Sequence, residues 1–144
     1  MVYHAAVNRG IYFAVSLFMA AKKRMKKRII ILENDADLAD SIRVYLEDTY
    51  KVYVVQDPAH LMRYISDYKI NVLVTDLDTT HPDFHQHITK AKDLYPNLKI
   101  LVMYMFIDDD NNLARAILND VDDYIFKPFD ADVLKHKLDR LIRH

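Results

Sequence analysis

Polar and charged side chains follow three short apolar runs of this chain. Glu33 and Asn34 come after the first run, Asp76 after the second, and Lys127 after the third. If each run is a strand of one parallel sheet, the carboxyl ends of the strands bring these side chains to one edge. Carboxylate oxygens are ligands for hard divalent cations, and a lysine ammonium pairs with an anion. Taken singly, each residue could instead cap a helix or remain solvated, but together they suit a divalent cation beside a phosphoryl group.

The elements that must position these residues are visible as alternating patterns along the chain. Short continuous apolar runs, typical of strands buried on both faces, occur at residues 29–32, 52–55, 72–74, 100–103 and 124–126. Apolar residues at helical spacing follow each run, and Asp57 and Asp130 stand where they would cap two of the helices. The alternation predicts an α/β fold with a doubly wound, five-stranded parallel sheet. Right-handed crossovers favour a flavodoxin-like (βα)5 arrangement with strand order 2-1-3-4-5.

Composition excludes several kinds of site. The chain has 144 residues, of which 51% are hydrophobic and 28% charged, as expected for one globular domain. The absence of cysteine rules out disulfides, thiolate metal sites and cysteine nucleophiles. Gly10 is the single glycine, so a glycine-rich phosphate loop of the P-loop or dinucleotide-binding kind is ruled out as well.

Residues 1–28 differ from the rest and are predicted to form a separate arm or extra helix before a domain at 29–144. Seven of the 20 basic residues and none of the 21 acidic ones precede Ile29. The remainder is therefore acidic, which argues against nucleic acid as its partner. Residues 11–21 are apolar but too few to span a bilayer, which takes about 20 residues. Three interpretations stay open: a natural start at Met25, an amphipathic helix that docks on a second copy or a membrane surface, and an anchor.

Three segments resemble the successive signatures of response-regulator receiver domains of two-component signalling. They are Ile-Ile-Ile-Leu-Glu-Asn-Asp-Ala-Asp-Leu from Ile29, Val-Leu-Val-Thr-Asp ending at Asp76, and Asp-Asp-Tyr-Ile-Phe-Lys-Pro-Phe around Lys127. The resemblance covers about residues 27–143, and the Lys127-Pro128 pair is its most specific part. It implies a signal-receiving domain, not an enzyme, that takes a phosphoryl group from a histidine kinase or phosphorelay partner with Mg²⁺.

The resemblance also implies roles for individual residues. Asp76 matches the phospho-acceptor, which also ligates the metal, and Lys127 matches the lysine that binds the phosphoryl group. Glu33 and Asn34 match the acidic pair that holds Mg²⁺. Two further positions report phosphorylation to a distal face: Tyr104 stands at the switch Ser/Thr position, and Tyr124 matches the switch aromatic.

Several residues depart from the receiver pattern. Asn34 is a neutral amide where a metal-binding carboxylate is usual, so Mg²⁺ binding is expected to be weakened. Tyr104 replaces a small hydroxyl side chain and would fill the pocket that this side chain normally leaves. Asp78 could restore a carboxylate to the site or could point to water, and both interpretations stay open. Nearby His81 and His85 stand at helical spacing, where they could bind a metal or remain solvated.

Two alternatives compete with phosphorylation. A pseudo-receiver would keep the fold and act as a protein-interaction module, with its site broken by Asn34 and Tyr104. A haloacid-dehalogenase-type phosphatase is the remote alternative, because Asp76-Leu77-Asp78-Thr79 matches the first motif of those enzymes. That motif usually lies on the first strand, whereas here other strands and helices precede Asp76.

The partners expected from the resemblance are a histidine kinase or phosphotransfer protein and a downstream protein. A homodimer through the fourth helix, fifth strand and fifth helix of the domain is a further possibility. We expect a cytoplasmic protein without a nucleic-acid partner, and a membrane is not expected as a partner.

Overall fold

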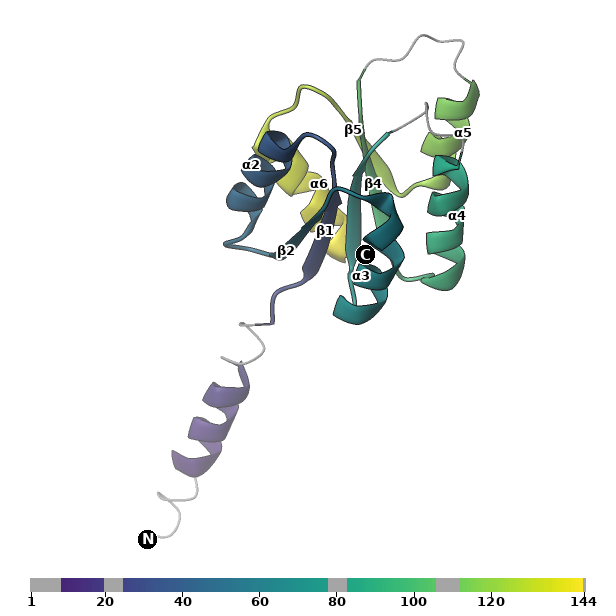
Figure 1. The fold of residues 1–144 in the computed structure, drawn as a ribbon. Helices are drawn as coiled ribbons and strands as arrows, with labels where there is room; N and C mark the ends of the chain where they lie inside the picture. Colours follow the sequence, from purple (N-terminus) through teal and green to yellow (C-terminus); the bar gives the residue numbers. More distant parts are fainter. Residues whose placement is uncertain (1–8, 20–24, 78–82, 106–111, 144) are drawn as a thin grey trace, which may run out of the picture.

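The computed structural model describes residues 9–19, 25–77, 83–105 and 112–143 of the chain. Its centre is a five-stranded parallel sheet in the order β2-β1-β3-β4-β5, which confirms the predicted fold class (Figure 1). The strands are β1 (Arg28–Leu32), β2 (Lys51–Val55), β3 (Val72–Asp76), β4 (Lys99–Tyr104) and β5 (Asp123–Phe126). Each strand contains the apolar run predicted for it.

Helices cover both faces of the sheet (Figure 1). One face carries α2 (Ala36–Leu46) and α6 (Ala131–Arg143), whose buried residues join one core cluster with Ile29 and Ile31. The other face carries α3 (Leu61–Tyr68), α4 (Phe84–Leu94) and α5 (Asn112–Asp120), which share a second cluster with Ile30. Because successive residues of a strand point to opposite faces, β1 must be apolar throughout to serve both clusters.

Aspartate side chains cap the start of α2 and of the turn before α3. Asp35 caps α2, since its side chain accepts a hydrogen bond from the backbone N–H of Leu38 at 3.1 Å. Asp57 caps the short 3-10 turn η1 (Pro58–His60), with Pro58 at its first position, and α3 continues from Leu61. The predicted cap at Asp57 is thus confirmed, although the first turn is 3-10 rather than α-helical. These caps fix where the chain leaves each strand end.

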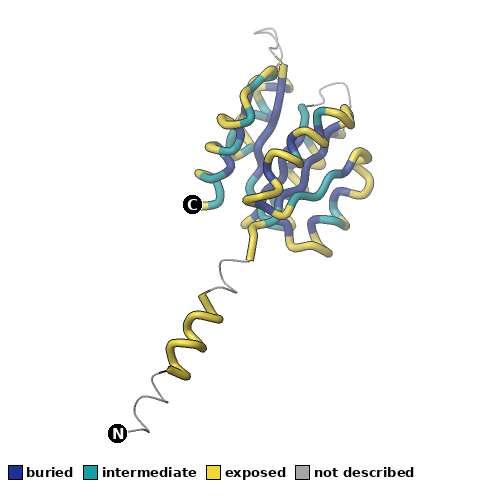
Figure 2. The backbone as a smooth tube through the Cα atoms, turned by 90° about the vertical axis from the view of Figure 1, so that its left-hand side faces the viewer, coloured by how far each residue is buried: buried dark blue, intermediate teal, exposed yellow. Residues whose placement is uncertain are grey.

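A further helix at residues 9–19 precedes the sheet. Every one of its residues is exposed, as the yellow colour of this segment shows in Figure 2. In both views it lies apart from the helices that cover the sheet. No helix in the described ranges is long and apolar enough to cross a membrane. The boundary between arm and domain at residue 29 stays a prediction; β1 itself begins at Arg28.

Candidate functional site

Three side chains meet at the carboxyl edge of the sheet, as the sequence predicted. The Lys127 ammonium, just after β5, lies 2.9 Å from the Oδ1 atom of Asp76 at the end of β3. The same Nζ atom lies 2.7 Å from the Oε2 atom of Glu33, which follows β1. One cation thus joins carboxylates from two neighbouring strand ends.

Backbone hydrogen bonds continue the strand ladders into this edge and position the side chains. The Lys127 N–H donates to the Tyr104 carbonyl at 2.8 Å, and the Leu77 N–H donates to the Met103 carbonyl at 2.8 Å. The Lys127–Pro128 peptide bond is cis. Asp76 and Lys127 therefore project from backbone that is held on both sides of β4.

Burial differs sharply among the three charged groups. The Glu33 side chain is 3% exposed and that of Lys127 is 16% exposed, whereas the Asp76 side chain is 37% exposed. Both Glu33 oxygens are used, since Oε1 accepts a hydrogen bond from the Asp35 N–H at 3.1 Å and Oε2 pairs with Lys127. Asp76 is the carboxylate that an incoming group can reach.

The electrostatics of the site follow from this partial burial. Burial raises the pKa of Asp76 above its ordinary value; the hydrogen bond from Lys127 opposes this rise, and the nearby Glu33 charge adds to it. Burial alone would lower the pKa of Lys127, but hydrogen bonds to Glu33 and Asp76 outweigh it and the net pKa is raised. Lys127 therefore remains an ammonium at neutral pH, ready to pair with an anion.

The metal-site residues predicted from sequence are only partly brought together. Glu33 and Asp76 share the lysine, and Asn34 follows Glu33 with an exposed side chain. Asp78 lies outside the described residues, so its contribution stays a prediction. Among the residues that the structure describes, no group of three or more His, Cys, Asp or Glu side chains gathers as a metal-binding cluster. The donors present fit a hard cation through two carboxylates and one amide, a set with little negative charge.

The histidines that follow this edge have another arrangement. His81 lies outside the described residues, and His85 on α4 contacts Asp120 of α5, with 2.6 Å between Nε2 and Oδ2. This contact joins two neighbouring helices, which supports a structural role for His85.

Tyr104, for which the resemblance predicts the switch position, packs among aromatic rings. Its side chain is buried, with ring centroids 5.7 Å from Tyr124 and 4.4 Å from Phe126. Burial raises the pKa of the Tyr104 phenol, and the neighbouring Tyr124 adds to the rise, so this hydroxyl stays neutral. Tyr124 is exposed and also lies under the Lys137 ammonium, which is 6.0 Å from its ring centroid.

Sequence reasoning missed two features of this region. Phe126 lies beside Tyr104 because these residues are register partners in the β4–β5 pair, and it points to the same side of β5 as Tyr124. Because side chains alternate between the two faces of a strand, the spacing of Tyr124 and Phe126 already indicated that both rings lie on the same face of β5. The sequence placed Glu33 and Lys127 at the same edge, but it did not show that Lys127 would pair directly with Glu33 as well as with Asp76.

Comparison with known proteins agrees with this geometry. The family model described as "Response regulator receiver domain" matches residues 29–139, so the chain belongs to the response-regulator receiver domain family. It is 29% identical over 122 residues to the regulatory protein VanRB of Enterococcus faecalis, covering 83% of this chain and 54% of that protein. It is 28% identical over 117 residues to the sensor histidine kinase TmoS of Ectopseudomonas mendocina, covering 80% of this chain and 12% of that protein. The chain thus spans about half or less of these relatives.

Crystal structures support the fold. A response regulator from Thermotoga maritima superposes with a TM-score of 0.73 at 19% identity, covering 83% of this chain and all of that chain. A response regulator receiver domain protein from Clostridium thermocellum gives a TM-score of 0.69 at 19% identity, covering 81% of this chain and 94% of that chain. Both have the fold that the resemblance implies.

Proposed function

We propose that this domain receives a phosphoryl group on Asp76 from a histidine kinase or phosphotransfer protein, in the presence of Mg²⁺. The observation that carries the proposal is the 2.9 Å contact between Asp76 and Lys127, with Asp76 more exposed than Glu33, the other described carboxylate that Lys127 contacts. A nucleophilic carboxylate beside a permanent cation is the pair that phosphoryl transfer requires.

In the transfer, an Asp76 oxygen attacks the phosphorus of a phosphohistidine on the partner. The P–N bond breaks, its electron pair goes to the imidazole, and an acyl phosphate forms on Asp76. Lys127 then moves from the carboxylates to a phosphoryl oxygen, which carries more charge. The raised pKa of Lys127 supports this role, because it keeps the ammonium charged throughout.

The residues around Asp76 fit a divalent cation through oxygen. Glu33, Asp76 and the amide of Asn34 are the candidate ligands, and Asp78 is a fourth candidate from sequence alone. Mg²⁺ there would neutralise charge on the phosphoryl oxygens. Because Asn34 is neutral and Glu33 is already paired with Lys127, we expect this affinity to be weak.

The test is exposure of the full chain to acetyl phosphate with and without Mg²⁺, followed by intact-protein mass measurement. The expected result is one added phosphoryl group that requires Mg²⁺ and disappears in Asp76→Asn. The exposed Asp67 on α3 offers a matched control, and Asp67→Asn should be modified like the wild type. Modification that survives Asp76→Asn, or none under any donor condition, would overturn the proposal.

One observation favours a second candidate, the phosphorylation-independent interaction module. Tyr104, Tyr124 and Phe126 form a closed set of ring contacts at the position that normally moves, with centroid distances of 4.4–5.9 Å. In this function the face formed by α5, β5 and α6 is a constant contact surface for a second copy or a downstream protein. Exposed Tyr124, Phe126 and Val133 on that face support it. Calorimetric titration distinguishes the two, since the module needs no Mg²⁺ affinity. For the first candidate, a domain that receives its phosphoryl group from a histidine kinase, we expect a cytoplasmic location.

A further inference from the structure

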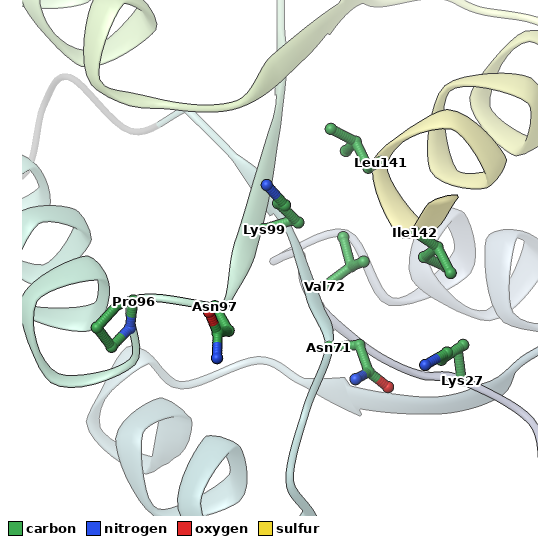
Figure 3. Close-up of a pocket in the computed structure, with 8 residues that line it drawn as sticks. All are labelled: Lys27, Asn71, Val72, Pro96, Asn97, Lys99, Leu141 and Ile142. Atoms are coloured by element: carbon green, nitrogen blue, oxygen red, sulfur yellow. The ribbon is translucent and has the colours of Figure 1, made fainter. Parts of the chain in front are cut away.

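The amino-terminal edge of the sheet, opposite to Asp76, is basic although the domain as a whole is acidic. Two cavities lie there, of about 630 Å³ and about 280 Å³, and they share Lys27 and Asn71. Figure 3 shows the smaller cavity, with Lys27 and Lys99 at its rim and Leu141 and Ile142 from the end of α6. We call the basic residues that line the two cavities the basic edge surface: Lys26, Lys27, Arg28, Lys51, Lys69 and Lys99.

The charge of the basic edge surface is largely uncompensated. Among the described residues, none of those lining either cavity is acidic. Lys26 and Arg28 donate to neutral partners, the carbonyls of Glu47 and Tyr68, both at 2.9 Å. Lys99 has an acidic neighbour at the limit of ion pairing, 4.0 Å from Asp122. Six basic side chains gathered from four separate parts of the chain therefore present a positive surface suited to an anionic partner.

The helix at residues 9–19 supplies an apolar surface just before these residues in the chain. Its seven large apolar side chains, from Ile11 to Met19, are between 51% and 74% exposed. Arg9 and Ser16 are seven residues apart and so share one side of the helix, whereas Phe18 points to the opposite side. At 1.5 Å per residue this helix is about 16 Å long, half the thickness of a bilayer core. It is suited to lie in an interface rather than to span one.

We propose that the helix of residues 9–19 and the basic edge surface together dock this domain onto an anionic lipid membrane. The apolar side chains enter the acyl boundary, and the lysines and arginine pair with lipid phosphates. Two features favour lipid over other occupants. A second copy would bring the same positive charge to this edge, and a nucleic acid would leave the apolar helix in water.

The fold explains how an acidic domain can still present a positive surface. Acidic residues outnumber basic ones in residues 29–144, but the start of the sheet brings Lys51, Lys69 and Lys99 of this part beside the basic residues that precede Ile29. Docking through this end leaves Asp76, at the opposite edge, facing the solvent and accessible to a protein. The inference does not depend on phosphorylation of Asp76.

The first experiment measures co-sedimentation of the full chain with vesicles of phosphatidylcholine alone or mixed with phosphatidylglycerol. Binding is expected with the mixed vesicles, with a strong decrease at high salt, because each basic residue near the surface contributes roughly fivefold to partitioning. The combined variant Lys27→Glu, Lys51→Glu and Lys69→Glu should bind at least tenfold more weakly. All three residues are exposed, so the fold should persist, which circular dichroism checks.

The matched control reverses three basic residues that do not line the cavities: Arg63→Glu, Lys90→Glu and Lys135→Glu. Arg63 lies over the Tyr64 ring at 5.8 Å as Lys51 lies over Tyr53 at 6.0 Å, so the two sets lose a similar local contact. The control should bind mixed vesicles within about twofold of the wild type. Equal loss in both combined variants, or equal binding to neutral and mixed vesicles, would overturn the proposal.

The helix is tested separately. Phe18→Glu should abolish vesicle binding, whereas Ser16→Glu, which replaces a polar residue on the opposite side of the same helix, should retain more of it. Because the chain has no tryptophan, Phe18→Trp adds a single reporter whose emission should shift to the blue on mixed vesicles. Vesicle binding that Phe18→Glu leaves intact contradicts the proposal. Three other outcomes also contradict it. One is loss of vesicle binding when millimolar inorganic phosphate is added. The others are tight binding of duplex DNA that Phe18→Glu does not affect, and self-association through the helix without vesicle binding.

Discussion

The rings of Tyr104 and Phe126 lie 4.4 Å apart, and the two residues are register partners across β4 and β5. Tyr124, two residues before Phe126, closes a set of three mutual ring contacts. The Tyr104 side chain is buried, whereas those of Tyr124 and Phe126 are exposed. The buried Tyr104 ring therefore packs beneath the two exposed rings. Inward movement of Tyr124 would overpack this site at a cost of about 1–3 kcal/mol.

Replacing Tyr104 by threonine should therefore restore a response to phosphodonor. In the wild type we expect small NMR shift changes across β4, β5 and the start of α6 on addition of acetyl phosphate and Mg²⁺. In Tyr104→Thr we expect large changes at Tyr124, because the ring gains space to enter. The variant should also lose about 3 kcal/mol of unfolding free energy, since a buried ring is removed.

Tyr53→Thr is the control for the loss of a ring. Tyr53 lies on β2, the outer strand farthest from β5, and its ring stacks on Tyr68 with 4.5 Å between the centroids. This variant should therefore leave the phosphodonor response small. Large wild-type shift changes around Tyr124 would instead show that Tyr104 does not hold the switch.

Asn34→Asp should tighten Mg²⁺ binding. The substitution adds a formal charge to an exposed position next to Glu33, on the edge that carries Asp76. We expect a gain of about 1 kcal/mol or more, the scale of a charge-assisted contact. Isothermal titration with MgCl₂ measures it, with Asn97→Asp at the opposite edge as the control. Equal affinity in wild type and Asn34→Asp would refute the role given to Asn34.

Lys127→Met should destabilise the fold because it leaves the carboxylate of Glu33 buried and unpaired. Glu33 is 3% exposed and Lys127 16%, so the pair is largely shielded from water. Removing one partner of such a pair costs about 3–5 kcal/mol, and adding Glu33→Gln should recover much of the loss. Urea unfolding at neutral pH measures both. Lys137→Met is the comparison, since its partner Asp123 is less buried and the expected loss is below about 1 kcal/mol. Similar losses of unfolding free energy in the two lysine variants would mean that the greater burial of Glu33 does not make its pair with Lys127 more important for stability.

The parts of this structure that sequence predicts are those written in local patterns. The runs at Ile29 and Val72 are apolar throughout because both faces of their strands are covered, and the residues after them reach the same edge for topological reasons. The individual side-chain contacts were not predictable. The Tyr104–Phe126 pair depends on which residues of β4 and β5 align. The topology brings Glu33 and Lys127 to one edge, but their ion pair depends on side-chain conformations that the sequence does not specify.

The basic edge surface is the same kind of case. Lys51, Lys69 and Lys99 each look like an ordinary solvated lysine in the sequence, and only the parallel topology brings these strand starts and helix ends beside Lys27. Net charge averaged over the domain conceals such segregation.

The last prediction concerns Asp76 and pH. Burial raises the pKa of Asp76 in the folded protein above the 3.8 of an unperturbed carboxyl, despite the hydrogen bond from Lys127. The folded state then binds its proton more tightly than the unfolded state does. Stability from this group is therefore full below 3.8 and is lost as pH rises through the raised folded pKa. Above the raised folded pKa the charged form of Asp76 is unfavourable, so Asp76→Asn should raise the melting temperature there.

The Asp76→Asn gain should shrink as pH falls toward 4, because the wild-type carboxyl then becomes neutral as well. Melting temperatures of both proteins at several pH values between 4 and 8 measure this difference. The exposed Asp67→Asn variant, for which no such burial exists, should show no comparable trend. A lower melting temperature for Asp76→Asn than for wild type at pH 7 would show that the Lys127 contact outweighs burial.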